Sequence, residues 1–243
     1  MNDMSNTPVM PESPDPKPFF QVWIDALTKP NESTFAAMVA SPSAKATTAY
    51  LWVFIGYLVE FFFSSLVQSA AMSSLLSRYG GSSSGAASGF VGRIVTAVCG
   101  APIIALIATL LFAVFVAIVQ WIAKMFGGRG TYDQMIYAFA SILAPFMIIS
   151  GVVSLLAAIP FVGLCFSAIL ALAGLYAFVL EIMAVKGVNQ FGWGAAIGSL
   201  LIPGLVIGFI CGCLIGVSVA VFGMAFKDVL QQIQQGIGNS PIY

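Results

Sequence analysis

A carboxyl group inside an apolar stretch is the feature of this sequence best suited to chemistry. Glu60 lies within the run 47–69, and Tyr57, Ser64 and Gln68 recur with it at three- and four-residue steps. Residues at these intervals share one face of an α-helix. An ionisable side chain within a membrane span is a candidate for handling protons or cations. The alternative is a structural role, in which a protonated carboxyl is hydrogen-bonded inside a helix bundle.

Other catalytic chemistry lacks the residue types that it needs. The chain has no histidine, which removes the commonest general base and metal ligand and every Ser-His or Cys-His nucleophile. We find no paired carboxylates, Ser-Lys pair or HExxH motif in a suitable register. The cysteines fall in apolar runs, where a thiol behaves as a small hydrophobe: Cys99, Cys165, Cys211 and Cys213. We therefore predict no enzyme activity, no catalytic residue, no metal site and no cofactor.

Glycines at intervals of four form a second pattern, in the last apolar run: Gly204, Gly208, Gly212 and Gly216. Helical residues four apart stack on one face, so these glycines predict a groove in which another helix can lie closely. Membrane helices are glycine-rich in general, which is the competing interpretation. Three overlapping GxxxG motifs on one face favour a helix-packing ridge, or glycine zipper, although they indicate no particular function.

A glycine-containing turn precedes residue 134. Gly127 and Gly128 are expected to end one helix, and Thr131 with Gln134 has the spacing of a capping box for the next helix. A phosphate-binding loop is the alternative interpretation of the glycines. We reject it because no strand precedes the turn and no Gly-Lys-Ser/Thr follows it.

Composition sets the class of protein that must position these residues. The 243 residues are 60% hydrophobic and 7% charged, and the mean hydropathy is +1.00. A soluble globule would need more polar surface than this, so we predict an integral membrane protein. Nine basic and nine acidic residues cancel, so no basic field favours nucleic acid. The expected partners are the lipid bilayer and other membrane proteins or a second copy of the chain.

The predicted fold is all-α: a bundle of five transmembrane helices preceded by a short amphipathic helix at the interface. We expect spans near 47–69, 94–123, 134–158, 161–183 and 195–222, because a bilayer needs about 20 apolar residues in a helix. A Ser/Gly-rich loop is expected at 72–92. The chain is thus divided into a disordered proline-rich tail (1–18), an amphipathic interfacial segment (19–46), a five-span membrane domain (47–222) and a polar C-terminal tail (223–243).

The interfacial segment begins with an amphipathic pattern. Gln21 and Asp25 are expected on the side opposite four large apolar residues, Phe19, Phe20, Trp23 and Leu27. Five spans place the two termini on opposite faces of the membrane. Six basic residues fall on the N-terminal side against three on the other, so the positive-inside rule predicts a cytoplasmic N-terminus and a C-terminus on the opposite side.

Several short motifs give the sequence a family resemblance. They are Phe126-Gly-Gly-Arg-Gly-Thr-Tyr-Asp-Gln134, Tyr137-Ala138, Ala144-Pro145, Ile159-Pro160, and Tyr176 followed by Val185-Lys-Gly-Val188. With them the stretch 35–222 resembles the Yip family, the Ypt/Rab-interacting membrane proteins, in its prokaryotic-type branch. The resemblance implies a five-span bundle with a cytoplasmic N-terminus in a prokaryotic cell membrane. Eukaryotic members bind prenylated Rab-type GTPases, so a GTPase partner follows by family analogy only, and no contact residue can be carried over.

Two functions remain open at this point. The first is a non-enzymatic scaffold or adaptor that recruits partners or organises the bilayer, in a role similar to trafficking. The second is a small-solute or ion transporter or channel that uses Glu60 and the helix around Pro145. The sequence identifies neither the partner nor the solute.

Overall fold

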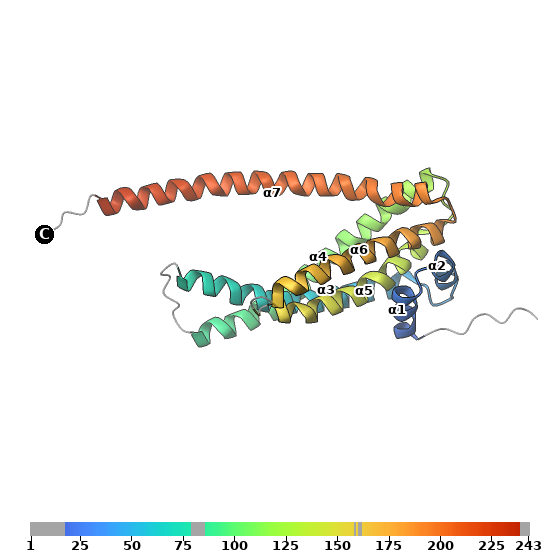
Figure 1. Ribbon diagram of the computed structural model, residues 1–243, viewed down its shortest axis with the longest axis horizontal. Coiled ribbons are helices and arrows are strands. Elements are labelled where there is room, and N and C mark those ends of the chain that lie inside the picture. The colour runs from blue at the N-terminus through green and yellow to red at the C-terminus, as the bar shows by residue number, and fades with distance from the viewer. Residues whose placement is uncertain (1–17, 79–85, 158, 160–161, 239–243) are drawn as a thin grey trace, which may run out of the picture. The chain divides into compact units, whose positions relative to one another are not determined.

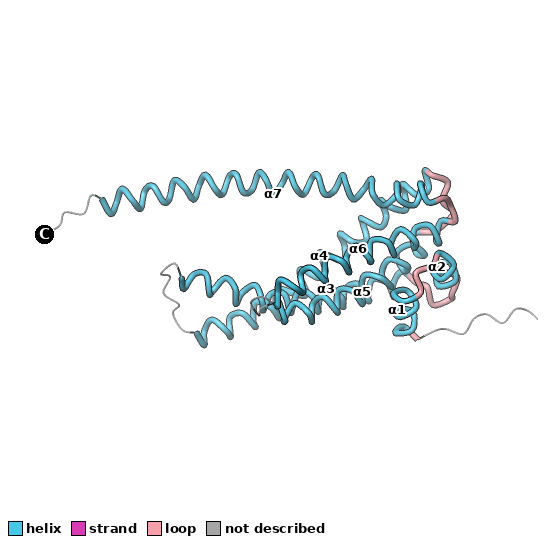
Figure 2. Tube along the Cα trace, in the orientation of Figure 1, coloured by secondary structure: helices cyan, strands magenta, loops and turns pink. Residues whose placement is uncertain are grey.

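The chain is an all-helical membrane protein. The computed structural model describes residues 18–78, 86–157, 159 and 162–238, and this part of the chain contains helices and no strand (Figures 1 and 2). The helices are α1 (Phe19–Thr28), α2 (Glu32–Val39), α3 (Ala46–Arg78), α4 (Ala86–Met125), α5 (Tyr132–Ala157), α6 (Val162–Asn189) and α7 (Trp193–Gly238). The predicted all-α fold with a short N-terminal helix is confirmed.

Five of these helices are long and apolar enough to cross a membrane. The candidate spans are Ala46–Val67, Ala97–Met125, Tyr132–Leu156, Ala168–Asn189 and Trp193–Ser218. Each meets the length of about 20 apolar residues that a bilayer requires. The chain divides into two compact units, residues 1–200 and 201–243, so that α7 begins in the first unit and continues into the second.

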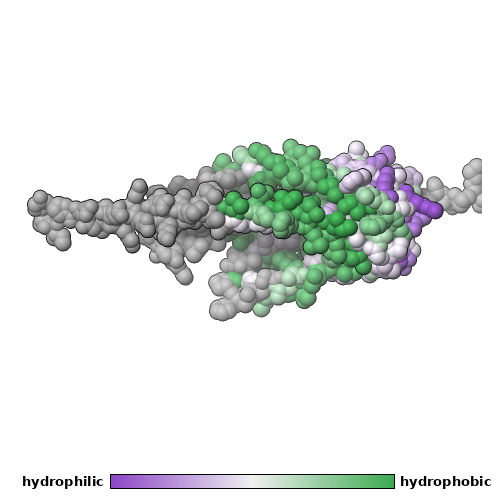
Figure 3. Space-filling view, turned by 90° about the horizontal axis from the view of Figure 1, so that it is seen from above, coloured by the Kyte–Doolittle hydropathy of each residue, from purple (hydrophilic) through white to green (hydrophobic). Residues whose placement is uncertain are grey.

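Helix α5 is the centre of the first unit. It contacts α3, α4 and α6 among the long helices, and also the two short helices α1 and α2. Its first half is buried on every side, from Met135 to Ile142, which is the pattern of an interior helix. The outward faces of the other spans are apolar and exposed, as lipid-facing surfaces must be; Leu111 and Leu172 are examples. Figure 3 shows this apolar surface in green, with hydrophilic residues gathered at one end.

Helices α3 and α5 run in the same direction and approach closely through two glycines. A Cβ atom built on Gly56 would lie 3.2 Å from the Cα of Ala144, and one built on Gly151 would lie 2.8 Å from the Cα of Glu60. Side chains at these two positions would force the backbones apart. We call this contact the α3–α5 seam. A hydroxyl pair adds to it, since the oxygens of Tyr50 and Tyr132 are 2.8 Å apart.

Several helices extend beyond the boundaries expected from the sequence. The predicted loop 72–92 is helical up to Arg78 and again from Ala86, and residues 79–85 lie outside the described part of the chain. The predicted tail 223–243 is helical to Gly238. Alanine, serine and leucine in these segments are compatible with a continuing helix. The glycines and serines nearby therefore did not predict the residue at which each helix ends. The proline-rich tail 1–17 lies outside the described residues.

Helix α6 also continues past its predicted end at residue 183 to Asn189. Lys186 lies within this extension, and its ammonium group forms an ion pair with Glu32 of α2. The extension changes the position of Glu181, which was expected at the end of the span. It lies eight residues before Asn189, or about 12 Å along the helix.

Candidate functional site

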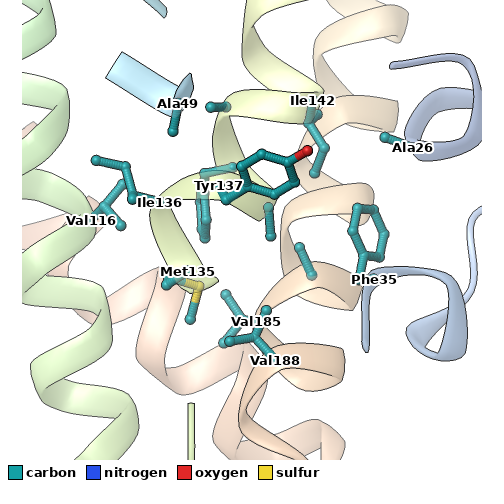
Figure 4. Close-up of a cluster of buried hydrophobic side chains, with 14 of the residues drawn as sticks. Ala26, Phe35, Ala49, Val116, Met135, Ile136, Tyr137, Ile142, Val185 and Val188 are labelled. Carbon is teal, nitrogen blue, oxygen red and sulfur yellow. The ribbon is translucent and has the colours of Figure 1, made fainter. Parts of the chain in front are cut away.

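The two short N-terminal helices form a cap on the first unit. Helix α1 contacts α5, and α2 contacts α5 and α6, all near the ends of the spans (Figure 1). Ala26 of α1 and Phe35 of α2 are completely buried, and Figure 4 shows both side chains in the cluster around Tyr137. The cap is therefore held by a hydrophobic core that it shares with the membrane bundle.

Polar contacts fix the same cap in place. The Tyr176 hydroxyl of α6 donates a hydrogen bond of 2.6 Å to the carbonyl of Leu27, and Lys186 pairs with Glu32. Gly187 brings the α6 backbone against the start of α2, because a Cβ there would lie 2.5 Å from the Glu32 carbonyl oxygen. Only glycine permits this approach, so the sequence of α6 positions α2 directly.

Asp25 lies on the buried side of α1, although the amphipathic pattern placed it on the outer side. It is 5% exposed, and its Oδ1 lies 2.8 Å from Nζ of Lys29 one turn later. Phe19, Phe20 and Ile24 are exposed instead. The predicted division of α1 into two faces was wrong, because Gln21 is exposed together with Phe20 whereas Asp25 is buried. The helix packs through Val22 and Ala26, and an ion pair makes the burial of Asp25 tolerable.

A cavity of about 560 Å³ lies between the cap and the bundle. Its lining comes from α1, α2, the connection to α3, and α5: Val22, Asp25, Lys29, Ser33, Thr34, Ala37, Met38, Ser41, Ser43 and Tyr137. Apolar side chains, hydroxyl groups and one ion pair thus share the space. The sequence gave no indication of this cavity, because its walls are brought together only when α1 and α2 dock.

The predicted turn before α5 has the geometry of a capped helix start. Gly127 has a φ of +88°, in the left-handed region that glycine favours. The Thr131 amide donates to Oε1 of Gln134 over 3.0 Å, and the Gln134 amide donates to Oγ1 of Thr131 over 3.3 Å. These two bonds are reciprocal, as in a capping box. Gly128 leaves room for Asn189, whose Oδ1 would lie 2.5 Å from a Cβ at that position.

A buried polar pair that was not predicted from the sequence lies behind this turn. Gln120 of α4 donates from Nε2 to the Gly130 carbonyl over 2.6 Å, and to Oδ1 of Asn189 over 3.1 Å. Asn189 accepts from the Gly130 amide and donates to the Val185 carbonyl. We call Gln120 and Asn189 the amide clip, since they join α4, the turn and α6. In the sequence, the signal for this pair was Gln120, a single glutamine inside a long apolar run.

The intramembrane polar residues are only partly brought together. Glu60 of the same helix and Glu181 of α6 both lie close enough to Tyr57 for their charges to act on it, so Glu181 is a second span carboxyl in this region that was not predicted from the sequence. Ser64 donates back to the Phe61 carbonyl of α3. The side chain of Gln68 lies outside the described residues. Within the described residues, no three acidic, cysteine or histidine side chains gather to hold a metal ion.

A match to a protein-family model identifies the family of this chain. The model of the Yip1 domain matches residues 24–216. The chain belongs to the Yip1-domain family. Searches of curated proteins and of solved structures found no match.

The Yip1 domain, as matched, contains most of the candidate site. It starts within α1, after the cavity-lining Val22, and ends inside the fifth span, so it includes most of the cap and cavity, the amide clip and the two span carboxyls. The ridge glycines from Gly204 to Gly216 also fall within it, in the second compact unit. The close contact of these glycines with another helix stays a prediction.

Proposed function

We propose that this Yip1-domain protein is a non-enzymatic membrane adaptor whose cap is the docking platform for a partner. The observation that carries the proposal is the attachment of α1 and α2 to α5 and α6 through Ala26, Phe35, the Glu32–Lys186 ion pair and the Tyr176 bond. Ten- and eight-residue helices are too short to be stable alone. Docking therefore gives the cap a defined surface.

The outer face of the cap offers an apolar edge to that partner. Phe20 is 62% exposed, and Phe19 and Ile24 beside it are 57% and 44% exposed. Aromatic side chains of this kind are common anchors at protein interfaces. The proposed partner is another membrane protein, a second copy of the chain or, by family analogy, a GTPase, in a role that organises membranes or resembles trafficking.

Site-specific photocross-linking in cells tests the adaptor. A benzophenone side chain at Phe20 should give one reproducible protein adduct, because that position faces away from the bundle. The control is the same probe at Leu172 of α6, which is 67% exposed on a membrane span and should yield lipid adducts. The absence of a protein adduct from Phe20 would contradict the proposal.

A second function, the conduction of a small solute or ion, has support of its own. Glu60 and Glu181 come from different spans, and both lie close enough to Tyr57 for their charges to act on it. Carboxyl groups that face a bundle interior from separate helices are typical of proton and cation pathways. We favour the adaptor because Lys186, the basic residue that shares a span with Glu181, pairs with Glu32 of the cap, and the described residues contain no group of metal-ligating side chains.

The Glu60→Gln variant separates these two functions. If the carboxyl is structural, Gln should preserve the fold and partner recruitment, because a protonated carboxyl and an amide offer similar hydrogen-bonding groups. If it conducts cations, the variant should fold normally and lose flux, because Gln cannot ionise. We expect the first result in liposome flux and thermal-melting assays. Loss of a pH-dependent flux with unchanged melting would instead favour the conduit.

We also propose the orientation drawn from the basic residues, with the N-terminus cytoplasmic and the C-terminus outside, in a prokaryotic cell membrane. Cysteines introduced at Ser5 and Ser240 should then react with an impermeant thiol reagent from opposite sides. The native cysteines must be replaced first. Labelling of both termini from the same side would show that one of the five helices does not cross.

The glycine ridge is proposed as the seam by which α7 contacts another helix. Gly208→Leu should then lower the melting temperature of the solubilised protein strongly, because a large side chain separates helices that depend on small residues. Leu205→Ala on the same helix is the control and should cost little. Equal melting temperatures for the two variants would contradict the proposal that the ridge packs against another helix.

A further inference from the structure

We infer that the cavity under the cap binds the phosphate-bearing headgroup of a membrane phospholipid. Its volume of about 560 Å³ falls within the roughly 300–1,000 Å³ that is typical of small-molecule sites. The lining combines an apolar side and a polar side, which is the division that a lipid headgroup and its first acyl carbons need. The inference concerns a ligand of the cap, and it holds whether or not a protein also docks there.

Depth is the first reason to choose a lipid. Tyr137, which forms the floor of the cavity, is five residues into a span that begins at Tyr132, or about 8 Å along the helix. The hydrocarbon core of a bilayer is about 30 Å thick, so a site about 8 Å along a span lies near one face of the membrane. The cap residues in the walls lie at the end of the first unit where hydrophilic residues replace the apolar surface (Figure 3). The cavity therefore lies where the polar and apolar surfaces of this unit meet.

The donors in the lining suit a phosphodiester. The ammonium group of Lys29 has three N–H donors. One side of this group faces the Asp25 carboxylate in the ion pair. The Lys29 side chain is 64% exposed. Thr34 and Ser33 add hydroxyl groups from the first turn of α2, and Tyr137 adds one from below. Lysine and hydroxyl groups are common ligands of phosphate oxygens.

The apolar part of the lining provides a path for the glycerol and the first methylenes. Val22 of α1 faces the cavity together with Ala37 and Met38 of α2. Burying methylene groups against such side chains stabilises binding by about 0.8 kcal/mol each. A soluble phosphate compound could use only the polar side, so the lining favours the lipid over a free phosphate ester.

Native mass spectrometry of the full chain in detergent tests the inference. The probe is dioleoyl phosphatidylglycerol, compared with dioleoylglycerol, which has the same chains without phosphate, and with glycerol 3-phosphate, which has the phosphate without chains. One phosphatidylglycerol should bind, dioleoylglycerol should not, and glycerol 3-phosphate should compete weakly. Equal binding of dioleoylglycerol would overturn the phosphate contact, and equal competition by glycerol 3-phosphate would overturn the lipid source.

Matched variants assign the binding to this cavity. Ala37→Trp fills the cavity from α2 and should weaken phosphatidylglycerol binding by about ten-fold or more, since a filled pocket has no space for the ligand. Ala40→Trp is the control, because Ala40 is exposed at the end of the same helix and does not line the cavity. Thr34→Val removes one hydroxyl group from the cavity with little change of side-chain shape. Thr47→Val is its control, because Thr47 does not line the cavity. Unchanged binding in Ala37→Trp, with melting equal to that of the control, would overturn the site.

Discussion

Replacing Gly151 with leucine is expected to lower the free energy of unfolding by about 3 kcal/mol or more, at the upper end of the cost of overpacking. A Cβ at this position would lie 2.8 Å from the Cα and 3.1 Å from the backbone nitrogen of Glu60. Both atoms belong to the helix backbone, which cannot rotate away as a side chain can. Helices α3 and α5 would have to separate along the α3–α5 seam.

Gly174→Leu provides the matched control for this prediction. Gly174 also lies in a membrane span, in α6, and a Cβ built there meets no atom within 4 Å. Leucine has the higher helix propensity, so the control should be neutral or slightly stabilising. The measurement is unfolding of the solubilised variants by SDS titration. Equal stabilities for the two variants would show that the close approach is not required.

The second large effect is expected from the amide clip. Asn189→Leu removes the partner of the Gln120 amide and of the Gly130 N–H, both of which are buried. Each unsatisfied group costs about 1–3 kcal/mol, so the variant should lose about 2–4 kcal/mol of stability. The same SDS titration measures it. Gln21→Leu on the exposed side of α1 is a control for the loss of an amide and should change little.

A double-mutant cycle then distinguishes a network from two independent bonds. Gln120→Leu alone removes one partner of Asn189 and the donor to the Gly130 carbonyl, whereas the double variant removes both side-chain amides together. The double variant should therefore lose clearly less than the sum of the two single losses, because part of each single loss is the cost of an abandoned partner. Additive losses would mean that Gln120 and Asn189 act separately.

The local features of this protein were readable from its sequence. The hydropathy of the five apolar runs predicted five spans, because crossing a bilayer requires only about 20 apolar residues within one segment. The turn at Gly127 followed from the preference of glycine for positive φ, and Thr131 and Gln134 had the spacing that their reciprocal bonds need. These properties depend on residues within a few positions of each other.

Contacts between helices were not readable in the same way. Gly56 and Gly151 form no repeat, so nothing in the sequence distinguished them from other glycines, although they make the close α3–α5 seam. Helical spacing placed Gln21 and Asp25 on one face of α1, but the bundle buries Asp25 and leaves Gln21 and Phe20 exposed. Which face is covered depends on the neighbouring helix.

The candidate site shows the same division. The sequence by itself determined that Glu60 lies inside a span and shares a face with Tyr57, since that follows from spacing along one helix. Only the tertiary structure decided that Glu181 of α6 lies close enough to the same tyrosine for its charge to act on it, and that residues of α1 and α2 line a cavity together with Tyr137. Lipid does not favour one apolar helix face over another, so the positions of small residues and buried polar groups select how the helices pack.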